Sequence, residues 1–532
     1  MSEFNIDELL KQIKELEYEL KAVKKYGLVW DKENTKEEVV LKCENNIPIL
    51  KEDKTKKLVF GTDNNILIEG DNYHALSSLL FVYQDSIDVI YIDPPYNTGR
   101  EDFVYNDNYV NDDDGYFHSK WLSFMSKRLS LARSLLKDTG VIFISIDDNE
   151  QANLKLLCDQ IFGSRNFVTN FCVIRSEGGG MAKQVVKGHD YCLVYAKNIS
   201  KFRPLGKPKD VRGKIVERDG VQYWIQEDWL RKEFGKYGNC HYEELIQYKG
   251  EEYKAEIDEG LKNGKYVLIK KDTGLHVIGK LRRLDEDSSK FYSIIKHLNK
   301  DGVNELKEMG INFDYPKPVS LIKELVYGAT MFNKNALILD FFAGSGTTGQ
   351  AVLEINSQYG GKRRFILCTN NENNICTDVT YPRLKAVITG KKPNGQKHSN
   401  GIPANLYYFK TDFIKDESNV EQAKYSLVEK VDSLLCISEN ILNEVERNDY
   451  SAHFIDGDRH LFIYNEYFNE RKFAEFKKRV ETAKGKKIVY VFSSDNEIDP
   501  SLISGKDMVV KPIPSKIYEI YKEIAESIKR GE

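Results

Sequence analysis

Cysteine pairs at metal-binding or redox spacing are missing from this sequence of 532 residues. Its eight cysteines form no Cys-x-x-Cys pair and no Cys/His cluster at the spacing of a zinc site. Several of them lie inside apolar runs, where a free thiol behaves as a small buried hydrophobic group. We therefore expect buried free thiols in a reducing compartment, and no metal site.

Long apolar runs and a leader pattern are missing as well. No segment reaches the ~18 consecutive apolar residues that a membrane-spanning helix requires. The first residues, Met-Ser-Glu-Phe-Asn, are acidic rather than basic, and no apolar core of a signal peptide follows them. These absences predict a cytoplasmic protein that does not enter a membrane.

An overall excess of positive charge is the third absence, since the net charge is −4. Any nucleic-acid site must then be a local basic surface. Between about residues 197 and 312, Lys, Arg, Tyr and Gly are frequent and basic residues slightly outnumber acidic ones. This is the sign of charge expected for a surface that faces phosphates. The chain is too long for one hydrophobic core, so we expect two or three domains.

Outside that region, short apolar strands alternate with amphipathic helices from Leu58 onward, which is the pattern of a doubly wound α/β sheet. The predicted strands are 66–68, 87–92, 140–146, 191–196, 336–339, 364–368 and 487–492. The predicted helices are 7–25, 73–83, 117–137, 149–162, 319–327 and 347–355, with two more near 420–446 and 513–529. Residues 97–116 show no periodicity and are predicted to form a mobile loop.

Two unusual turns come directly after predicted strands. The strand 87–92 leads into Asp93-Pro94-Pro95-Tyr96, an acidic turn that two prolines stiffen. The strand 336–339 leads into residues 340–346, Asp-Phe-Phe-Ala-Gly-Ser-Gly, where the glycines let the backbone approach a ligand closely. The helix behind this second turn, capped by Thr347 or Thr348, presents free N–H groups to an anion.

The residues after the second turn disfavour other ligands of glycine turns. No third glycine stands at dinucleotide spacing, and no Gly-Lys-Ser/Thr is present. The sequence therefore gives little support for a nicotinamide-binding or nucleoside triphosphate-binding site at this turn.

Together the two turns resemble the catalytic Asp-Pro-Pro-Tyr and cofactor Phe-x-Gly-x-Gly motifs of amino-group DNA methyltransferases. The catalytic motif precedes the cofactor motif, which is the order of the permuted β class. The resemblance implies an α/β fold with a Rossmann-like, S-adenosylmethionine-dependent methyltransferase sheet. It also implies an enzyme that methylates N6 of adenine in duplex DNA.

The resemblance assigns the catalytic residues Asp93, Pro94, Pro95 and Tyr96. Adenine N6 is a poor nucleophile because its lone pair is delocalised into the ring. The Asp93 carboxylate and the Pro94 carbonyl accept hydrogen bonds from its two N–H groups and so free that lone pair. The two prolines hold these acceptors in the required direction. Tyr96 offers a face on which a flipped base can stack. A turn without catalytic function is the competing interpretation, which the strand-forming residues before Asp93 disfavour.

The resemblance also implies a set of cofactor-binding residues. By this resemblance, Asp340 is expected to contact the ammonium group of S-adenosylmethionine, and the glycine turn is expected to hold its methionine part. Asp71 is placed to reach the adenine of the cofactor, although a helix N-cap is a competing or simultaneous role. Glu372 is the nearest acid for the ribose, and Lys317 precedes the helix that closes the methionine pocket. The full predicted set is Asp71, Lys317, Asp340, Phe342, Gly344, Gly346, Thr347 and Glu372.

Flanking motifs resemble the modification (Mod) subunit of Type III restriction–modification systems and its solitary relatives. They include Tyr-Ile-Asp-Pro-Pro-Tyr-Asn-Thr-Gly at 91–99, Ser145–Glu150, His189–Tyr191 and Thr380-Tyr381-Pro382-Arg383-Leu384. We predict five parts: an N-terminal helical segment (1–57), a catalytic half (58–196), a target-recognition domain (197–312), a cofactor half (313–410) and a C-terminal α/β segment (411–532).

The implied partners are double-stranded DNA, a second copy of the chain and a restriction helicase–nuclease subunit. The helix at 7–25 and the segment beyond residue 410 are candidates for self-association. Cytosine-N4 methylation uses the same geometry, although its motif more often begins with Ser than with Asp. A DNA-recognition subunit that mainly recruits a restriction enzyme is a further alternative. A methyltransferase of RNA or small molecules is the weakest one.

Overall fold

The computed structural model describes most of the chain in two compact units. The described residues are 28–32, 35–99, 103–106, 108–111, 113–178, 184–209, 211, 213–233, 238–284, 286–415, 431–466, 469–492, 502–503, 505–513 and 526. Unit 1 contains the residues up to Phe202, Ser293–Val326 and the residues from Asn335 onward, and unit 2 contains Arg203–Tyr292 and Tyr327–Lys334. The predicted helix 7–25 lies outside the described residues, as does nearly all of the predicted helix 513–529.

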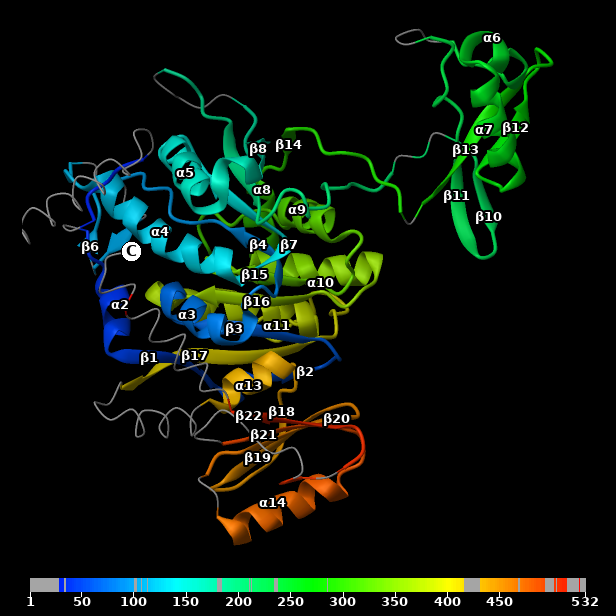
Figure 1. The fold of residues 1–532 in the computed structure, drawn as a ribbon. Coiled ribbons are helices and arrows are strands. Elements are labelled where there is room, and N and C mark those ends of the chain that lie inside the picture. Colours follow the sequence, from blue (N-terminus) through cyan, green and yellow to red (C-terminus); the bar gives the residue numbers. More distant parts are fainter. Residues whose placement is uncertain are drawn as a thin grey trace, which may run out of the picture. The chain divides into compact units, whose positions relative to one another are not determined.

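Among these residues, unit 1 has a central sheet of eleven strands in the order β1-β17-β3-β16-β15-β4-β7-β9-β8-β14, with β2 paired to β17 (Figure 1). The strands are β1 Asn46–Glu52, β2 Leu58–Val59, β3 Asn64–Glu69, β4 Ile87–Ile92, β7 Leu136–Ile146, β8 Phe167–Ile174, β9 His189–Ala196, β14 Ile294–Lys296, β15 Leu337–Asp340, β16 Arg364–Thr369 and β17 Asn405–Lys415.

The strands from β17 to β7 are parallel to one another, whereas β9 runs antiparallel between β7 and β8. β15 lies between β16 and β4, so a strand from late in the chain sits in the middle of the sheet beside an early one. This order confirms the predicted doubly wound sheet with permuted motifs.

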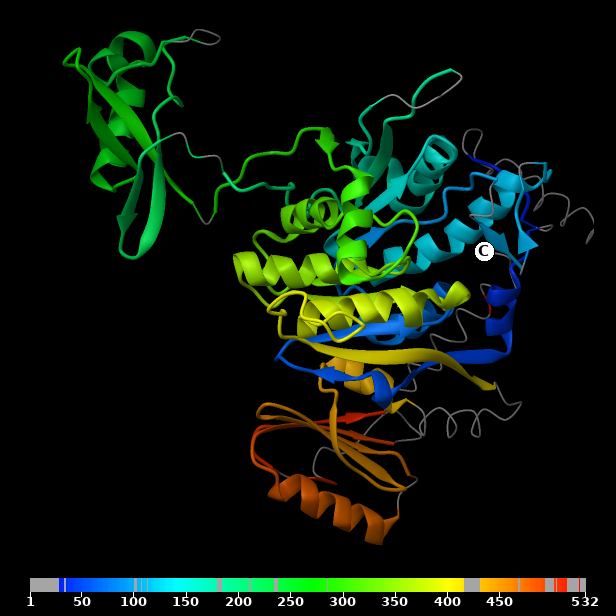
Figure 2. The ribbon, with the colours of Figure 1, turned by 180° about the vertical axis from the view of Figure 1, so that it is seen from behind.

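Helices cover both faces of the central sheet. The main ones are α3 Asn72–Tyr83, α4 Phe117–Leu135, α5 Gln151–Cys158, α8 Asn299–Met309, α9 Val319–Thr330, α10 Thr347–Tyr359 and α11 Tyr381–Thr389. Figure 1 shows α3, α4 and α5 in front of the sheet, and Figure 2 shows α10 and α11 from behind. Because both faces are covered, β4, β15 and β16 are apolar without alternation and almost entirely buried.

Five strands of the central sheet are not predicted by the sequence: β1, β2, β8, β14 and β17. β1 lies in the polar stretch before residue 58 and pairs antiparallel with β17, Ile47 opposite Ile414. The predicted N-terminal segment 1–57 therefore contributes a strand to the central sheet, from the polar stretch for which the sequence predicts no element. The apolar run of β1 is short and has polar residues on both sides, so it gives little signal of a strand in the sequence. Its strand conformation depends on pairing with the distant β17.

The predicted loop 97–116 contains a small two-stranded sheet, β5 Val104–Tyr105 with β6 Asn108–Tyr109. Phe103, Tyr105 and Val110 are buried, and the Phe103 ring packs edge-on against Phe124 at 5.1 Å between centroids. The prediction of a segment without regular structure is wrong at this point. The strands are too short to give a recognisable pattern in the sequence.

Unit 2 has its own small core. Within its described residues, an antiparallel sheet has the order β10-β11-β13-β12, with β10 Ile215–Arg218, β11 Val221–Gln226, β12 Tyr266–Lys270 and β13 His276–Arg283. The helices are α6 Leu245–Lys249 and α7 Glu251–Lys262. Leu230, Cys240, Leu245 and Ile257 are buried there, and the rings of Trp229 and Tyr266 stack at 5.1 Å.

The C-terminal part of unit 1 has a second sheet, whose described strands have the order β18-β19-β20-β21-β22. They are β18 Asn443–Arg447, β19 Ser451–Asp456, β20 Arg459–Tyr464, β21 Lys486–Val491 and β22 Met508–Pro512, with α14 Glu470–Thr482 packed on them. Of the helix predicted near 420–446, the part up to residue 430 lies outside the described residues; α13 Asp432–Glu439 confirms the prediction, and it is wrong at 443–447, which form β18. α13 packs against α3: the Tyr83 hydroxyl donates to the carbonyl of Ile437 at 2.9 Å.

All eight cysteines are free and seven of them are buried, which confirms the predicted buried thiols. Burial raises the pKa of Cys376, for example, to about 11. In the described part of the chain, no helix is both long enough and apolar enough to cross a membrane.

Candidate active site

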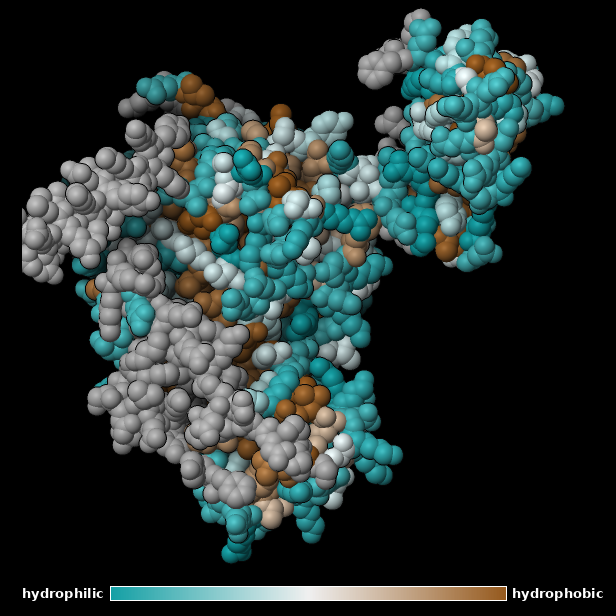
Figure 3. Space-filling view, in the orientation of Figure 1, coloured by the Kyte–Doolittle hydropathy of each residue, from teal (hydrophilic) through white to brown (hydrophobic). Residues whose placement is uncertain are grey.

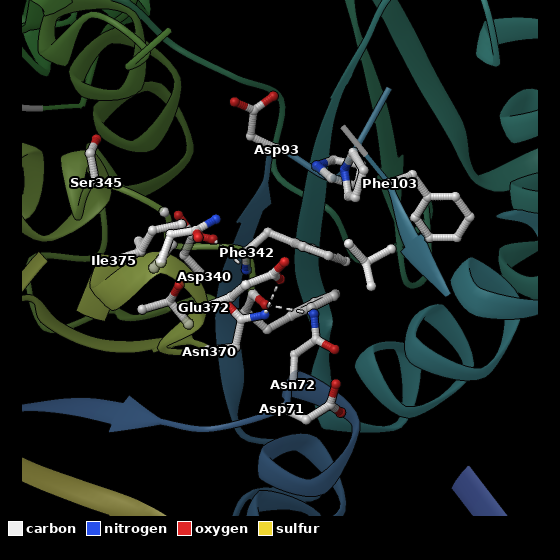
Figure 4. Close-up of a pocket in the computed structure, with 18 of the residues that line it drawn as sticks. Asp71, Asn72, Asp93, Phe103, Asp340, Phe342, Ser345, Asn370, Glu372 and Ile375 are labelled. Carbon is white, nitrogen blue, oxygen red and sulfur yellow. Dashed lines mark hydrogen bonds between the residues drawn. The ribbon is translucent and has the colours of Figure 1, made fainter. Parts of the chain in front are cut away.

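The Asp-Pro-Pro-Tyr turn (residues 93–96) and the glycine turn (residues 340–346) lie side by side at one edge of the central sheet. β4 and β15 are parallel neighbours, with Val89 opposite Ile338 and Ile90 opposite Leu339. Parallel strands end at the same edge, so the segments after them meet there. The fold thus joins two distant parts of the sequence around one cavity (Figure 4).

The cavity has a volume of about 720 Å³, within the roughly 300–1,000 Å³ of small-molecule sites. Its lining includes every predicted site residue except Tyr96 and Gly346, namely Asp71, Asp93, Pro94, Pro95, Lys317, Asp340, Phe342, Gly344, Thr347 and Glu372. Figure 4 shows Asp93, Asp340 and Asp71 one after another along the cavity. Three carboxyl groups therefore lie at its two ends and its middle.

Buried side chains from α4 and the start of α5 hold the Asp-Pro-Pro-Tyr turn. Trp121 is fully buried, and its Nε1 donates to the carbonyl of Pro95 at 2.8 Å. Just beyond the turn, Asn97 has a φ of +57°, and its amide donates to Oε1 of the buried Glu150 at 2.6 Å. Because proline also fixes φ within the turn, its backbone has little freedom to move.

At one end of the cavity, the lining residues Asp93 and Lys317 contact Tyr96, which is not itself part of the lining. The Tyr96 hydroxyl donates to Asp93 Oδ1 at 3.0 Å. Lys317 Nζ donates to the Tyr96 hydroxyl at 2.6 Å and lies 3.3 Å from Asp93 Oδ1. Burial and the Asp93 carboxylate raise the pKa of Tyr96 well above its usual value, so the phenol keeps its proton. The Lys317 side chain, predicted to serve the cofactor, therefore reaches the Asp-Pro-Pro-Tyr turn.

The glycine turn depends on backbone conformations that favour glycine. Gly344 and Gly346 have φ angles of +48° and +79°. Gly346 is the N-cap of α10, which has no side-chain cap, so the predicted capping by Thr347 or Thr348 is wrong. Thr348 instead donates to Asp340 Oδ2 at 2.5 Å. A helix start without a side-chain cap suits an anionic ligand group.

Asp340 ends β15 and is buried in the wall of the cavity. Its carboxyl group accepts hydrogen bonds from the Phe342 backbone N–H at 3.0 Å and from Thr348. Burial raises the pKa of Asp340 to about 7. A nearby ammonium group would favour the ionised carboxylate and lower this pKa. Asp340 and the start of α10 together suit the ammonium and carboxylate groups of an amino acid.

Arg383, a fully buried residue of α11, supports the glycine turn from behind. Its Nη1 donates to Ser345 Oγ at 2.9 Å and to Thr347 Oγ1 at 2.8 Å, and its Nε donates to Gln350 Oε1 at 2.8 Å. The sequence does not predict this role. The only sign of it is the Tyr-Pro-Arg-Leu motif, which marks the position without showing its partner.

The far end of the cavity is organised around Asp71 and Arg128. Asp71 Oδ1 accepts from the Tyr73 backbone N–H at 2.7 Å, so the predicted N-cap role at α3 is confirmed. The buried Arg128 lies 3.4 Å from Asp71 Oδ2 and makes two hydrogen bonds to Glu37, at 2.6 and 2.8 Å. Glu37 and Asn72 also line the cavity. The sequence does not predict them, and Glu37 lies in a polar segment without a motif.

Glu372 lines the cavity three positions beyond the end of β16, where a short 3-10 helix begins. The Asn370 amide donates to Glu372 Oε2 at 3.3 Å. The structure therefore brings this carboxylate into the same cavity as Asp71 and Asp340. Among the residues that the structure describes, no cluster of three His, Cys, Asp or Glu side chains is arranged to hold a metal ion.

Comparisons with a family model and with individual known proteins agree on one family. The DNA methylase family matches residues 87–379. The Type III restriction-modification enzyme StyLTI Mod subunit of Salmonella typhimurium is 34% identical over 405 residues, which are 65% of this chain and 60% of that protein. The chain thus spans less than two thirds of the StyLTI Mod subunit.

Two further comparisons cover more of the other protein. The Type III restriction-modification enzyme EcoPI Mod subunit of Escherichia phage P1 is 30% identical over 534 residues, covering 79% of this chain and 80% of the relative. Among solved structures, the PvuII DNA methyltransferase (cytosine-N4-specific) is similar with 12% identity and a TM-score of 0.34, covering 63% of this chain and 97% of that one.

Proposed function

The chain belongs to the DNA methylase family, and from that premise we propose that it transfers the methyl group of S-adenosylmethionine to N6 of adenine in duplex DNA. The observation that carries the proposal is that Asp93 and Asp340 line one cavity. Asp93 directly follows β4, and Asp340 is the last residue of the neighbouring strand β15. The Asp-Pro-Pro-Tyr turn suits the amine that receives the methyl group, and the glycine turn suits the amino-acid part of a ligand. Methyl transfer requires both ligands to meet in one site.

The part of the cavity from the glycine turn to Asp71 would hold the cofactor, which supplies an electrophilic methyl group when bound. Asp340 pairs with its ammonium group, and the start of α10 faces its carboxylate. Asp71 and Glu372, which line the same cavity, are the acids proposed for its adenine and ribose. Gly344 keeps this wall free of a side chain. These residues bind and orient the methyl donor, and none of them needs to transfer a proton.

The Asp-Pro-Pro-Tyr turn would receive the target base. The Asp93 carboxylate and the Pro94 carbonyl accept hydrogen bonds from the two N–H groups of adenine N6, which frees the nitrogen lone pair for bond formation. The turn is already fixed by Trp121 and Asn97, so little reorganisation is needed when the base arrives. As the bond from nitrogen to the methyl group forms, the bond from that group to the cofactor's sulfur would break, and the positively charged nitrogen would then lose one proton to solvent. Tyr96 supplies the ring on which the flipped base stacks.

Unit 2 is proposed to read the DNA sequence. Most of it falls within the predicted recognition region 197–312, which is rich in Lys, Arg and Tyr. Its visible surface in Figure 3 is largely hydrophilic, as expected of a surface that contacts phosphates and base edges. A module with its own core can vary its base contacts without disturbing the cavity of unit 1.

The similarity to Type III Mod subunits supports a role as the modification subunit of a restriction–modification system, or as a solitary relative. We propose a homodimer and a cytoplasmic location, where the DNA substrate lies. Light scattering at micromolar concentration should give twice the monomer mass of 61.4 kDa. A fully active monomer under those conditions would rule out the dimer. A pull-down from the native host would identify a helicase–nuclease partner.

Long-read sequencing tests the activity most directly. Genomic DNA from a methylation-deficient host that expresses the wild-type chain should carry N6-methyladenine at one short sequence motif. DNA from the same host expressing Asp93→Ala should carry none. N4-methylcytosine at the motif would overturn the assignment to adenine. The absence of any DNA modification, from a protein that binds S-adenosylmethionine in calorimetry, would overturn the DNA substrate.

A deletion within unit 2 tests the recognition role. Lys207 and Ser289 exchange two backbone hydrogen bonds, at 2.8 and 2.9 Å, so the chain can be rejoined between them by a two-residue turn such as Asn-Gly. Deletion of 208–288 should preserve cofactor binding and abolish preference for the methylated motif in a DNA-binding assay. Retained motif preference would place recognition elsewhere. The wider region 197–312 is unsuitable for deletion because it contains β14 and α8.

A further inference from the structure

Lys317 connects the two turns of the cavity. Its backbone carbonyl accepts from Thr347 Oγ1 at 3.3 Å, beside the glycine turn. Its side chain is only 11% exposed and extends to the Asp-Pro-Pro-Tyr turn. α8 packs closely behind, since a Cβ on Gly302 would lie 2.9 Å from the Lys317 carbonyl carbon. The residue is therefore held from its backbone while its ammonium group meets Tyr96 and Asp93.

The hydrogen bonds at this ammonium group have a fixed direction. Lysine has donors and no acceptor, so the Tyr96 hydroxyl must accept from Lys317 Nζ, at 2.6 Å. The single proton of that hydroxyl is then directed to Asp93 Oδ1, at 3.0 Å. Asp93 Oδ1 is thus occupied from within the protein. Asp93 Oδ2 is left as the oxygen that can accept from a bound amine.

The charges around Lys317 are balanced. Its Nζ lies 3.3 Å from Asp93 Oδ1 and 3.5 Å from Oδ2 of the buried Asp190. Arg175 Nε lies 3.2 Å from Asp190 Oδ1. Burial raises the pKa of Asp190, while Lys317 and Arg175 lower it. Two cations thus face two carboxylates, and the ammonium group is held in place from two sides.

We infer that Lys317 is a positioning residue for the acceptor amine rather than a cofactor-binding residue. It holds the Tyr96 ring and one oxygen of Asp93 in fixed positions, so that only the other oxygen is presented to the base. This inference rests on the proposed function, because it assigns the residue to the acceptor side of methyl transfer. The Lys317 ammonium group also lies over the Tyr96 ring, 4.9 Å from its centroid, which restricts how that ring can tilt when a base stacks on it.

Three variants test the inference by calorimetry with S-adenosylmethionine and by single-turnover methylation of unmethylated genomic DNA at saturating cofactor. Lys317→Met removes the charge at similar length, and Tyr96→Phe removes the hydroxyl but keeps the ring. Each should slow methyl transfer roughly 10- to 100-fold and leave the cofactor Kd within about twofold. The double variant should be no slower than the slower single variant, because both changes break the same chain of hydrogen bonds.

Two controls complete the design. Lys323→Met removes a lysine of α9 that pairs with Glu354 at 2.9 Å, and it should change neither rate nor affinity by more than about twofold. Lys317→Arg keeps a donor and should recover part of the lost rate, even if Lys317→Met folds poorly.

Two outcomes would overturn the inference. One is a cofactor Kd weakened tenfold or more with an unchanged rate at saturating cofactor. The other is losses that multiply in the double variant. Failure of the proposed function is a separate result, since wild-type protein would then methylate no DNA.

Discussion

The Asp-Pro-Pro-Tyr turn and the glycine turn occupy equivalent positions, each at the end of a parallel strand, yet they are built in opposite ways. The first has its backbone restricted by Pro94 and Pro95 and is tied to α4 through Trp121. The second uses glycines at positive φ and is supported from behind by Arg383. Rigid side chains fix one turn, and the absence of side chains opens the other.

This difference is explained by the ligand that each turn is proposed to bind. Hydrogen-bond acceptors for an amine must already point in the right direction, because their reorientation would add to the barrier. A cofactor wall must instead let the ligand approach the backbone closely, which any Cβ would hinder. Substitutions in the first turn should therefore change the rate of methyl transfer. Substitutions in the second should change cofactor binding first.

The largest effect is expected for Asp93→Ala. Loss of one preorganised acceptor should slow methyl transfer by roughly 10²–10³-fold, while the cofactor Kd stays within about twofold. Radiolabel transfer to DNA and calorimetry measure the two quantities. Asp93→Asn is the matched control, because its amide oxygen still accepts one hydrogen bond, and it should lose less rate. A variant Asp93→Ala that keeps a tenth of the wild-type rate would contradict the role of this carboxylate.

The two glycines provide a second comparison. Gly344 lines the cavity, and a Cβ added to it would meet no atom closer than 3.9 Å, so Gly344→Ala should act mainly on the ligand and weaken cofactor binding about tenfold or more. A Cβ on Gly346, which does not line the cavity, would lie 3.0 Å from Thr380 Cγ2. Gly346→Ala should therefore lower the free energy of unfolding by about 1–3 kcal/mol.

Calorimetry and denaturant unfolding of both glycine variants separate these effects. Unchanged cofactor affinity in Gly344→Ala would remove the glycine turn from the binding site.

The pH dependence of cofactor binding tests Asp340. Its pKa is about 7 in the free protein, so below that pH the carboxyl group is neutral and must lose a proton before it pairs with an ammonium group. The affinity should therefore weaken as the pH falls, by roughly tenfold between pH 7.5 and 6. Calorimetry in buffers of different ionisation enthalpy should show proton release on binding. Asp340→Asn should bind weakly with no such pH dependence, and a wild-type affinity that is flat over this range would contradict the pairing.

The smallest effect is expected for Trp121→Phe. This change keeps an aromatic ring but removes the hydrogen bond to the Pro95 carbonyl, which is worth about 0.5–1.5 kcal/mol. Methyl transfer should slow by a few-fold, and the cofactor Kd should not change. An equal loss of cofactor affinity would show that the two turns are coupled through the sheet and are not independent parts.

The local elements of the central sheet were accessible from the sequence because their signals are local. β4 and α3 agree with prediction to within one residue, since a run of apolar residues and the Asp71 N-cap mark their limits. β1 and β17 were not accessible, because their partners are distant in the sequence: they pair with each other across some 360 positions, and β17 also pairs with β3. β18 lies in a region predicted as helix, and only its pairing with β19 sets its conformation.

The chemistry of this protein is already present in its covalent sequence: an acidic, proline-stiffened turn and a glycine turn, each at the end of an apolar strand. Those properties depend on the φ preferences of proline and glycine, which hold whatever the rest of the fold does. The folded structure was needed to show that Lys317 reaches Tyr96 and Asp93, and that Arg383 supports the glycine turn. Such contacts join residues far apart in the chain, and their geometry exists only after the sheet has brought the strands together.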